Sequence, residues 1–212
     1  MKMAFSMIEL VMVIVVIGIL ASISIPNLNK NIRQDAIDSI KNDIIYTKHL
    51  ALLDNKHNIN DSLWQMTYWK WRYTLCNSSN KVFYSVSSDM NEKGNVNREE
   101  SAIDPSNGRY LYQSNYFCNE DATSNEDDSP KVIISEKFGI KSITNGGSCE
   151  RDVQSIAFDN FGRPHRGIES YSSVNYEYMM KSNCSFTFTF FDEDIKPFTI
   201  VIEAMTGRVF VE

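Results

Sequence analysis

The chain has 212 residues, a formal net charge of −6 at pH 7 and a sequence pI of about 5.2. This length is enough for one soluble domain of ordinary size beyond an N-terminal helix, and it leaves too few residues for a second. The acidic balance excludes a protein that coats nucleic acids generally, because such proteins need a basic surface. The net charge does not exclude a local basic patch on the surface.

Residues 4–26 form an apolar run that contains one carboxylate, Glu9. Residues 5–25 contain no Lys, Arg or His, and a helix of that length spans roughly 30 Å, the thickness of the hydrocarbon core of a bilayer. We therefore expect a transmembrane helix over residues 5–25, with Lys2 on the cytoplasmic side. A charge at the centre of such a helix costs roughly 2.5–3.5 kcal/mol, so Glu9 is expected to pair with a cation.

The alternative interpretation of this run is an ordinary signal anchor, or a secretory signal that is cut near Ser22 to Ser24. Such signals place a basic segment before an apolar one, with no acid inside it. Neither predicts the order Phe-Ser-Met-Ile-Glu-Leu at residues 5–10.

The pattern beyond Pro26 is amphipathic. Apolar residues recur near a 3.6-residue spacing, with charged residues between them, at Leu28, Ile32, Ala36, Ile37, Ile40, Ile44, Ala51 and Leu52. We predict one helix over residues 5–54, whose second half is covered by the rest of the chain. Pro26 removes one helical hydrogen bond, so a kink or a local break is expected there.

Residues 55–212 are rich in aromatic and β-branched residues and are expected to form one β-rich head. Strands are predicted over residues 64–75, 81–86, 154–158, 184–190, 198–203 and 208–211. Alternation is strict in 184–190, where Cys184, Phe186, Phe188 and Phe190 share one face. The predicted fold class is α+β: a long N-terminal helix, transmembrane in its first half and amphipathic in its second, packed on an antiparallel β-sheet. Trp64, Trp69 and Trp71 are expected in the core or in cross-strand pairs.

Four cysteines, Cys76, Cys118, Cys149 and Cys184, follow the apolar run, and their even number favours disulfides on the oxidising side of a membrane. Three connectivities are compatible with the spacing. We favour Cys76 with Cys118 and Cys149 with Cys184, which would each close a loop worth about 3–4 kcal/mol in the chain-entropy model.

The run from Ala4 to Glu9 resembles the N-terminus of type IV pilins and type II secretion pseudopilins. The resemblance implies a leader over residues 1–4, cleavage by a prepilin peptidase between Ala4 and Phe5, and methylation of the new amine. The family usually has Gly before the cut, where this chain has Ala4. It also implies that Glu9 neutralises the Phe5 ammonium of a neighbouring subunit, and that Pro26 allows the helix to stretch in the filament.

Two blocks near the C-terminus, residues 155–164 and 200–209, resemble minor pseudopilins, in particular the H subunit of type II secretion and the FimT-like minor pilins. The implied protein is a pilin-like minor subunit of a pseudopilus for protein secretion, or of a type IV pilus. It would be a single-pass inner-membrane protein with a periplasmic head before it enters the fibre. Its partners would be other pilin or pseudopilin subunits, the prepilin peptidase, the inner-membrane assembly platform and membrane lipid.

Residues 89–100 follow the spacing of a twelve-residue calcium loop, with Asp89 at position 1, Asn91 at position 3, Gly94 at position 6 and Glu100 at position 12. Lys93 stands at position 5, where an oxygen ligand is wanted. The alternative is a solvated hairpin loop in which Asn and Gly form turns. Calcium is the one cofactor that the sequence suggests, and none is required.

Arg163 and Arg166, beside His165, are the basic cluster of the head. FimT-like proteins are associated with DNA capture, so the alternative function is a minor pilin whose head binds DNA through these side chains for natural transformation. The plain alternative is a solvated turn after a strand. An enzyme is not predicted, since no nucleophile, zinc or phosphate-binding motif is present in the sequence.

Overall fold

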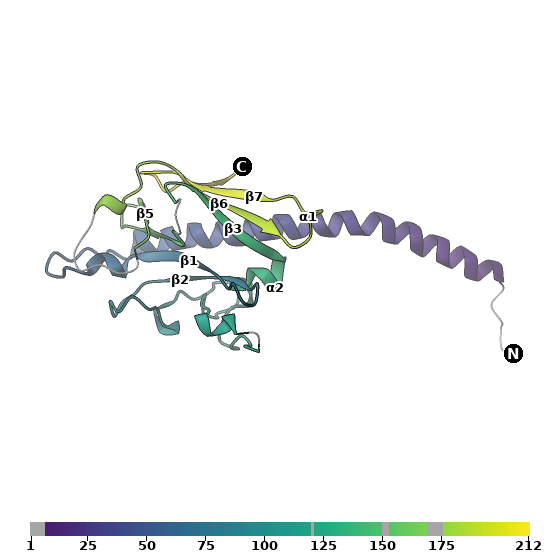
Figure 1. The fold of residues 1–212 in the computed structure, drawn as a ribbon, viewed down its shortest axis with the longest axis horizontal. Coiled ribbons are helices and arrows are strands. Elements are labelled where there is room, and N and C mark those ends of the chain that lie inside the picture. Colours follow the sequence, from purple (N-terminus) through teal and green to yellow (C-terminus); the bar gives the residue numbers. More distant parts are fainter. Residues whose placement is uncertain (1–6, 120, 150–152, 169–175) are drawn as a thin grey trace.

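The computed structural model describes residues 7–119, 121–149, 153–168 and 176–212, and for residues 21–30 and 177 it describes the backbone only. Helix α1 runs over Met7–Leu53 and is followed by a head in which helix α2, Ile134–Phe138, is short. Figure 1 shows the N-terminal part of α1 projecting beyond the head, while its C-terminal part lies along the strands. The helix continues through Pro26, where a kink or break was predicted.

Two four-stranded antiparallel sheets form the head. The first has the order β2-β1-β4-β5, and the second has the order β3-β6-β7-β8. The strands of the first sheet are β1 (Trp69–Leu75), β2 (Val82–Ser87), β4 (Ser155–Phe158) and β5 (Pro164–Arg166). Those of the second sheet are β3 (Ile140–Gly147), β6 (Cys184–Phe190), β7 (Phe198–Ile202) and β8 (Val209–Val211).

The predicted fold class is wrong in two respects. The head holds two antiparallel sheets where one was expected. Within the residues that the structure describes, no helix combines the length and the apolar character needed to cross a membrane. This finding overturns the transmembrane first half of the helix and the single-pass inner-membrane localisation that depended on it.

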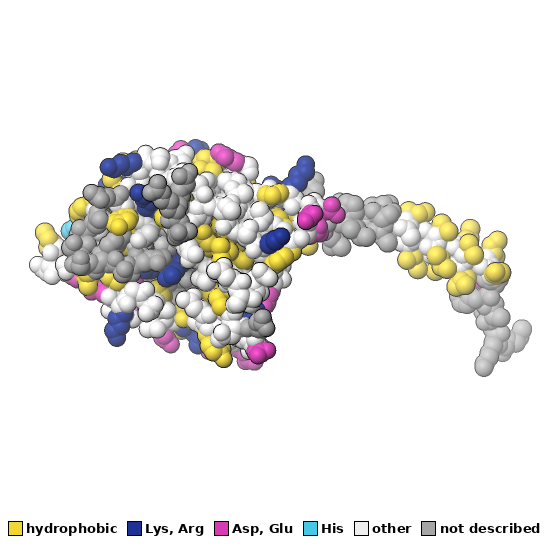
Figure 2. All heavy atoms as spheres, viewed as in Figure 1, with side chains coloured by type: hydrophobic (Ala, Val, Ile, Leu, Met, Phe, Trp, Pro, Cys, Tyr) yellow, Lys and Arg dark blue, Asp and Glu magenta, His cyan; other side chains and the backbone are white. Residues whose placement is uncertain are grey.

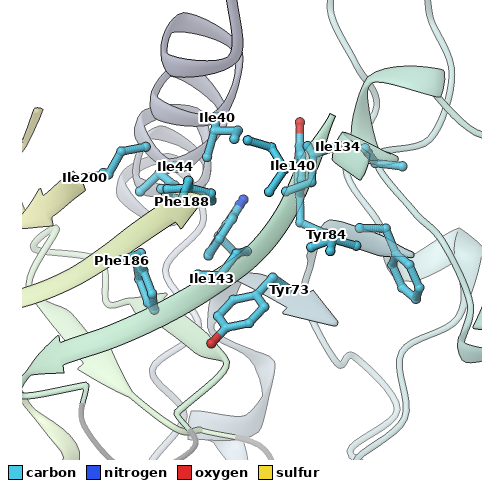
Figure 3. Packing of buried hydrophobic residues seen from close by; sticks show 14 of the residues in the cluster. Ile40, Ile44, Tyr73, Tyr84, Ile134, Ile140, Ile143, Phe186, Phe188 and Ile200 are labelled. Carbon is cyan, nitrogen blue, oxygen red and sulfur yellow. The ribbon is translucent and has the colours of Figure 1, made fainter. Parts of the chain in front are cut away.

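One hydrophobic core joins α1 to both sheets. Ala36, Ile40 and Ile44 of α1 are fully buried, as the amphipathic pattern requires. Figure 3 shows Ile40 and Ile44 beside Phe188 and Ile200 of the second sheet. The predicted inward position of Leu52 is wrong, because its side chain is exposed.

Aromatic side chains connect the two sheets to each other. The ring centroids of Trp71 on β1 and Phe186 on β6 are 5.5 Å apart, and Tyr73 on β1 donates a hydrogen bond of 2.6 Å to Asn145 on β3. Trp71 is fully buried, in agreement with the expected core position. These contacts make the two sheets parts of one core, since aromatic pairs contribute packing beyond their buried area.

Two disulfides close loops of the head, Cys76–Cys118 and Cys149–Cys184. This is the pairing that we favoured among the three that the spacing allows, and it is confirmed. The first ties the end of β1 to a segment 42 residues later, and the second ties the end of β3 to the start of β6.

The hairpin between β7 and β8 requires glycine. Gly207 has a φ of +60°, and a Cβ built there would lie 2.3 Å from the carbonyl oxygen of Gly162. A side chain at this position would therefore be strained and would also push away the turn between β4 and β5.

Candidate functional site

The most unusual surface of the molecule is the projecting segment, which we define as residues 7–20 of α1. Its large apolar side chains are exposed by between 48% at Val13 and 86% at Met7. Figure 2 shows hydrophobic side chains gathered along this part of the helix on the face in view. Soluble proteins seldom expose an apolar surface of this extent, and those that do generally use it for interaction.

The apolar side chains surround the projecting segment on all sides. A helix that is apolar all round is usually buried all round, whereas a helix on the surface of a domain has one apolar stripe. Val and Ile, which have low helix propensity, make up much of the segment, and tertiary packing normally supplies most of the stability of a helix. The segment therefore lacks, within one chain, the packing that its sequence calls for.

Glu9 lies in the first turn of α1, and its side chain is exposed. A carboxylate is favourable at a helix N-terminus, because the first amide groups carry a partial positive charge. From the sequence we expected Glu9 to be a charge inside a spanning helix. In the structure it lies in the first turn of α1, where the partial positive charge of the helix N-terminus favours a carboxylate. Ala4 and Phe5, the predicted processing site, lie outside the described residues, and so does the side chain of Pro26.

Arg33 of α1 is held by the head. Its guanidinium donates two hydrogen bonds to backbone carbonyls, 3.0 Å to Lys196 and 3.3 Å to Pro197, and lies 5.9 Å from the centre of the Phe198 ring. Ile32 packs against the core beside it, so the covered part of α1, which includes Ala36, Ile40 and Ile44, has begun by these residues.

Asp89, at the first position of the predicted calcium loop, is fully buried. Its two carboxylate oxygens accept backbone hydrogen bonds from Lys93, at 3.2 Å, and from Gly94, at 2.8 Å. The carboxylate thus closes the loop on itself by accepting the amides four and five residues further on.

Glu100, at the last position of the same loop, is engaged in the same way. It accepts hydrogen bonds from the backbone of Asn91, at 2.9 Å, from the side-chain amide of Asn91, at 2.7 Å, and from the backbone of Asn97, at 2.9 Å. No cluster of three or more acidic, His or Cys side chains that could hold a metal ion occurs in the described part of the chain. Calcium binding stays a prediction, and this geometry supports the turn alternative.

The predicted basic cluster is divided among local partners. The Nε atom of Arg163 lies 2.7 Å from an oxygen of Asp159, and Arg166 donates a hydrogen bond of 2.7 Å to the carbonyl of Ser148. His165 is buried, with 1% of its surface exposed. DNA binding by Arg163 and Arg166 stays a prediction. Asp159 compensates the charge of Arg163, whereas the neutral carbonyl of Ser148 leaves the charge of Arg166 uncompensated.

A buried ionic network went unnoticed in the sequence. Lys131 lies 2.9 Å from Asp43 on α1 and 3.0 Å from Asp104, and both carboxylates are buried. The hydroxyl of Tyr84 donates to Asp43 at 2.5 Å, and that of Ser129 donates to Asp104 at 2.6 Å. The network joins the covered part of α1 to the segment between β2 and β3.

The two carboxylates of this network differ in pKa. Burial raises the pKa of Asp43, although hydrogen bonds from Tyr84 and Lys131 oppose that rise. Burial would also raise the pKa of Asp104, but hydrogen bonds from Ser129, Ser106 and Lys131 outweigh it and lower this pKa to about 2. Asp104 is therefore the carboxylate that the network stabilises in its ionised form.

Compared with protein-family models, with curated proteins and with solved structures, the chain matches none. Membership of the pilin and pseudopilin family therefore stays a prediction from the N-terminal and C-terminal motifs.

Proposed function

We propose that this protein is a non-catalytic structural subunit, which assembles with copies of itself or with related subunits by packing their projecting segments together. One observation carries the proposal: residues 7–20 expose apolar side chains on every side of a helix that extends beyond the head. Bundled helices of this kind would bury each other's apolar surface and supply the packing that the isolated segment lacks.

The resemblance to type IV pilins and type II secretion pseudopilins supports a fibre as the product of assembly. In this proposal the peptidase cut between Ala4 and Phe5 creates the amine that pairs with Glu9 of a neighbouring subunit. The finer assignment, a minor subunit that serves protein secretion, rests on the resemblance of residues 155–164 and 200–209. Mass spectrometry of the mature chain tests the cut, since the proposal expects a methylated Phe5 and an intact Met1 contradicts it.

Sedimentation velocity of the full chain tests the assembly. We expect the wild type to form large species and Ile14→Asp to shift the distribution to monomers, because each buried Asp would have no partner. Leu53→Asp is the matched control, since Leu53 is an equally apolar residue of α1 that is 85% exposed at the other end of the helix. Assembly of Ile14→Asp at the wild-type concentration, or equal loss in Leu53→Asp, would contradict the proposal.

Glu9→Gln tests the charge pairing separately. The substitution keeps the size of the side chain and removes its charge, so it should weaken association less than Ile14→Asp and leave the melting temperature of the head unchanged. An unchanged sedimentation profile would remove Glu9 from the assembly contact.

A further inference from the structure

A cavity of about 380 Å³ lies beside the connector that follows α1 and the turn between β4 and β5. Residues 55–68 and 160–165 supply most of its lining. Figure 1 places the end of α1 and β5 at the end of the head farthest from Met7. The volume lies within the range of ordinary small-molecule sites, which are concave, mostly apolar and furnished with a few polar groups.

Aromatic rings form the wall of this cavity in a continuous series. The ring centroids of His57 and Trp64 are 4.7 Å apart, those of Trp64 and Tyr68 are 5.2 Å apart, and those of Tyr68 and His165 are 5.1 Å apart. Phe161 lines the same cavity and is 70% exposed. Trp64 and Tyr68 are almost fully buried, so the rings that a ligand could contact are those of Phe161 and of Tyr176, which is 60% exposed.

His165 also lines the cavity, but it is 1% exposed and its Nε2 atom is already engaged with Asp159 at 3.2 Å. Its Nδ1 atom is buried, so the ring helps to form the wall and offers no polar atom to a ligand.

The charge of the lining decides between classes of ligand. Arg163 is the one fixed charge among the described residues that line the cavity, and it is already paired with Asp159 at 2.7 Å. The amide side chains of Asn55 and Asn160 are neutral donors and acceptors. A phosphate would find no uncompensated cation here, whereas a neutral ligand with several hydroxyl groups matches both the rings and the amides.

We propose that this cavity binds a neutral saccharide. The C–H face of a pyranose ring packs against the exposed ring of Phe161, and hydroxyl groups bond to the side-chain amides of Asn55 and Asn160. The proposal is independent of the assembly role of the projecting segment, because it uses other residues at the other end of the molecule.

Saturation-transfer NMR and tryptophan fluorescence titrations of the full chain test this site. The probes are neutral disaccharides of glucose and of N-acetylglucosamine, with thymidine monophosphate as the anionic counterpart. We expect saturable binding of at least one disaccharide and no binding of the nucleotide. Absence of binding by every disaccharide overturns the proposal, and so does a nucleotide that binds more tightly, which would support the DNA-binding alternative instead.

Two exposed phenylalanines give matched variants. Phe161→Ala should weaken the saccharide about fivefold to tenfold, the effect of losing one ring contact at the rim. Phe191→Ala removes an exposed ring outside the cavity and should leave the affinity unchanged. Both changes are at the surface, so near-ultraviolet circular dichroism should stay as in the wild type. Equal affinities of the two variants would contradict the assignment.

Discussion

The two parts of α1 are built from similar apolar residues and lie in opposite environments. In the projecting segment the side chains of residues such as Ile14 are exposed, and in the covered part those of Ile40 and Ile44 are fully buried. The covered part carries charged residues between its apolar ones, so that only one face is apolar. The head thus buries the apolar face around Ile40 and Ile44, whereas the apolar side chains of residues 7–20 have no comparable cover within the described chain.

The largest expected effect comes from a matched pair of isoleucines. Ile44→Ala should lower the free energy of unfolding of the head by about 4 kcal/mol, because it leaves a cavity in the shared core. Ile14→Ala should change it by less than about 0.5 kcal/mol, because no core lies around that side chain. Urea unfolding followed by near-ultraviolet circular dichroism measures both, and similar losses of stability in the two variants would contradict the contrast between the two parts of α1.

Removal of the disulfide Cys149–Cys184 should have the next largest effect. The double substitution to Ala opens a loop of 35 residues and should lower the free energy of unfolding of the head by about 3 kcal/mol. Assembly through the projecting segment should persist below the lowered melting temperature, because neither cysteine contacts it. Calorimetry and sedimentation of the same sample separate the two properties, and loss of assembly by the folded variant would count against their independence.

Lys131→Met should lower the free energy of unfolding by somewhat less, about 2–3 kcal/mol, because it leaves Asp43 and Asp104 buried without their shared cation. The value is discounted because the lysine side chain is itself 15% exposed. Urea unfolding measures it. Lys137→Met, a change at a nearby exposed lysine, is the control and should be neutral.

The smallest effect is the acid response of Asp104. Its pKa of about 2 in the folded state lies below its ordinary value of 3.8, so its contribution to stability is present above pH 4 and is lost as the pH falls toward 2. We expect a loss of about 1–2 kcal/mol after allowance for solvent screening, and Asp104→Asn should remove that part of the pH dependence. Asp43 acts in the opposite direction, because its raised pKa favours the folded state at low pH.

What the sequence predicts well is determined by local pattern. Strand β6 follows directly from the alternation of Cys184, Phe186 and Phe188, because one of its faces is buried against the core. Strand β3 was missed since only Ile140 and Ile143 are buried in a polar segment that ends in two glycines, and pairing with β6 holds it in place. Its partner strand supplies a signal that the segment itself does not contain.

Contacts between residues that are distant in the sequence also escape prediction from local pattern. Asp43 has the helical spacing of a solvent-facing residue, and its partner Lys131 stands 88 residues later, so no local pattern connects them. Likewise, the loop from Asp89 to Glu100 has ligand spacing, but the same oxygens can accept backbone amides, and only three-dimensional geometry distinguishes the two uses.

The aromatic cavity and the projecting segment lie at opposite ends of the molecule. In an assembly that gathers the projecting segments at its centre, every subunit would turn one cavity toward the outside. A weak single contact then becomes strong through avidity, because a second site on the same particle meets its ligand at a high effective concentration. The length of the assembled particle, more than the affinity of one head, would set how firmly it holds a glycan-covered surface.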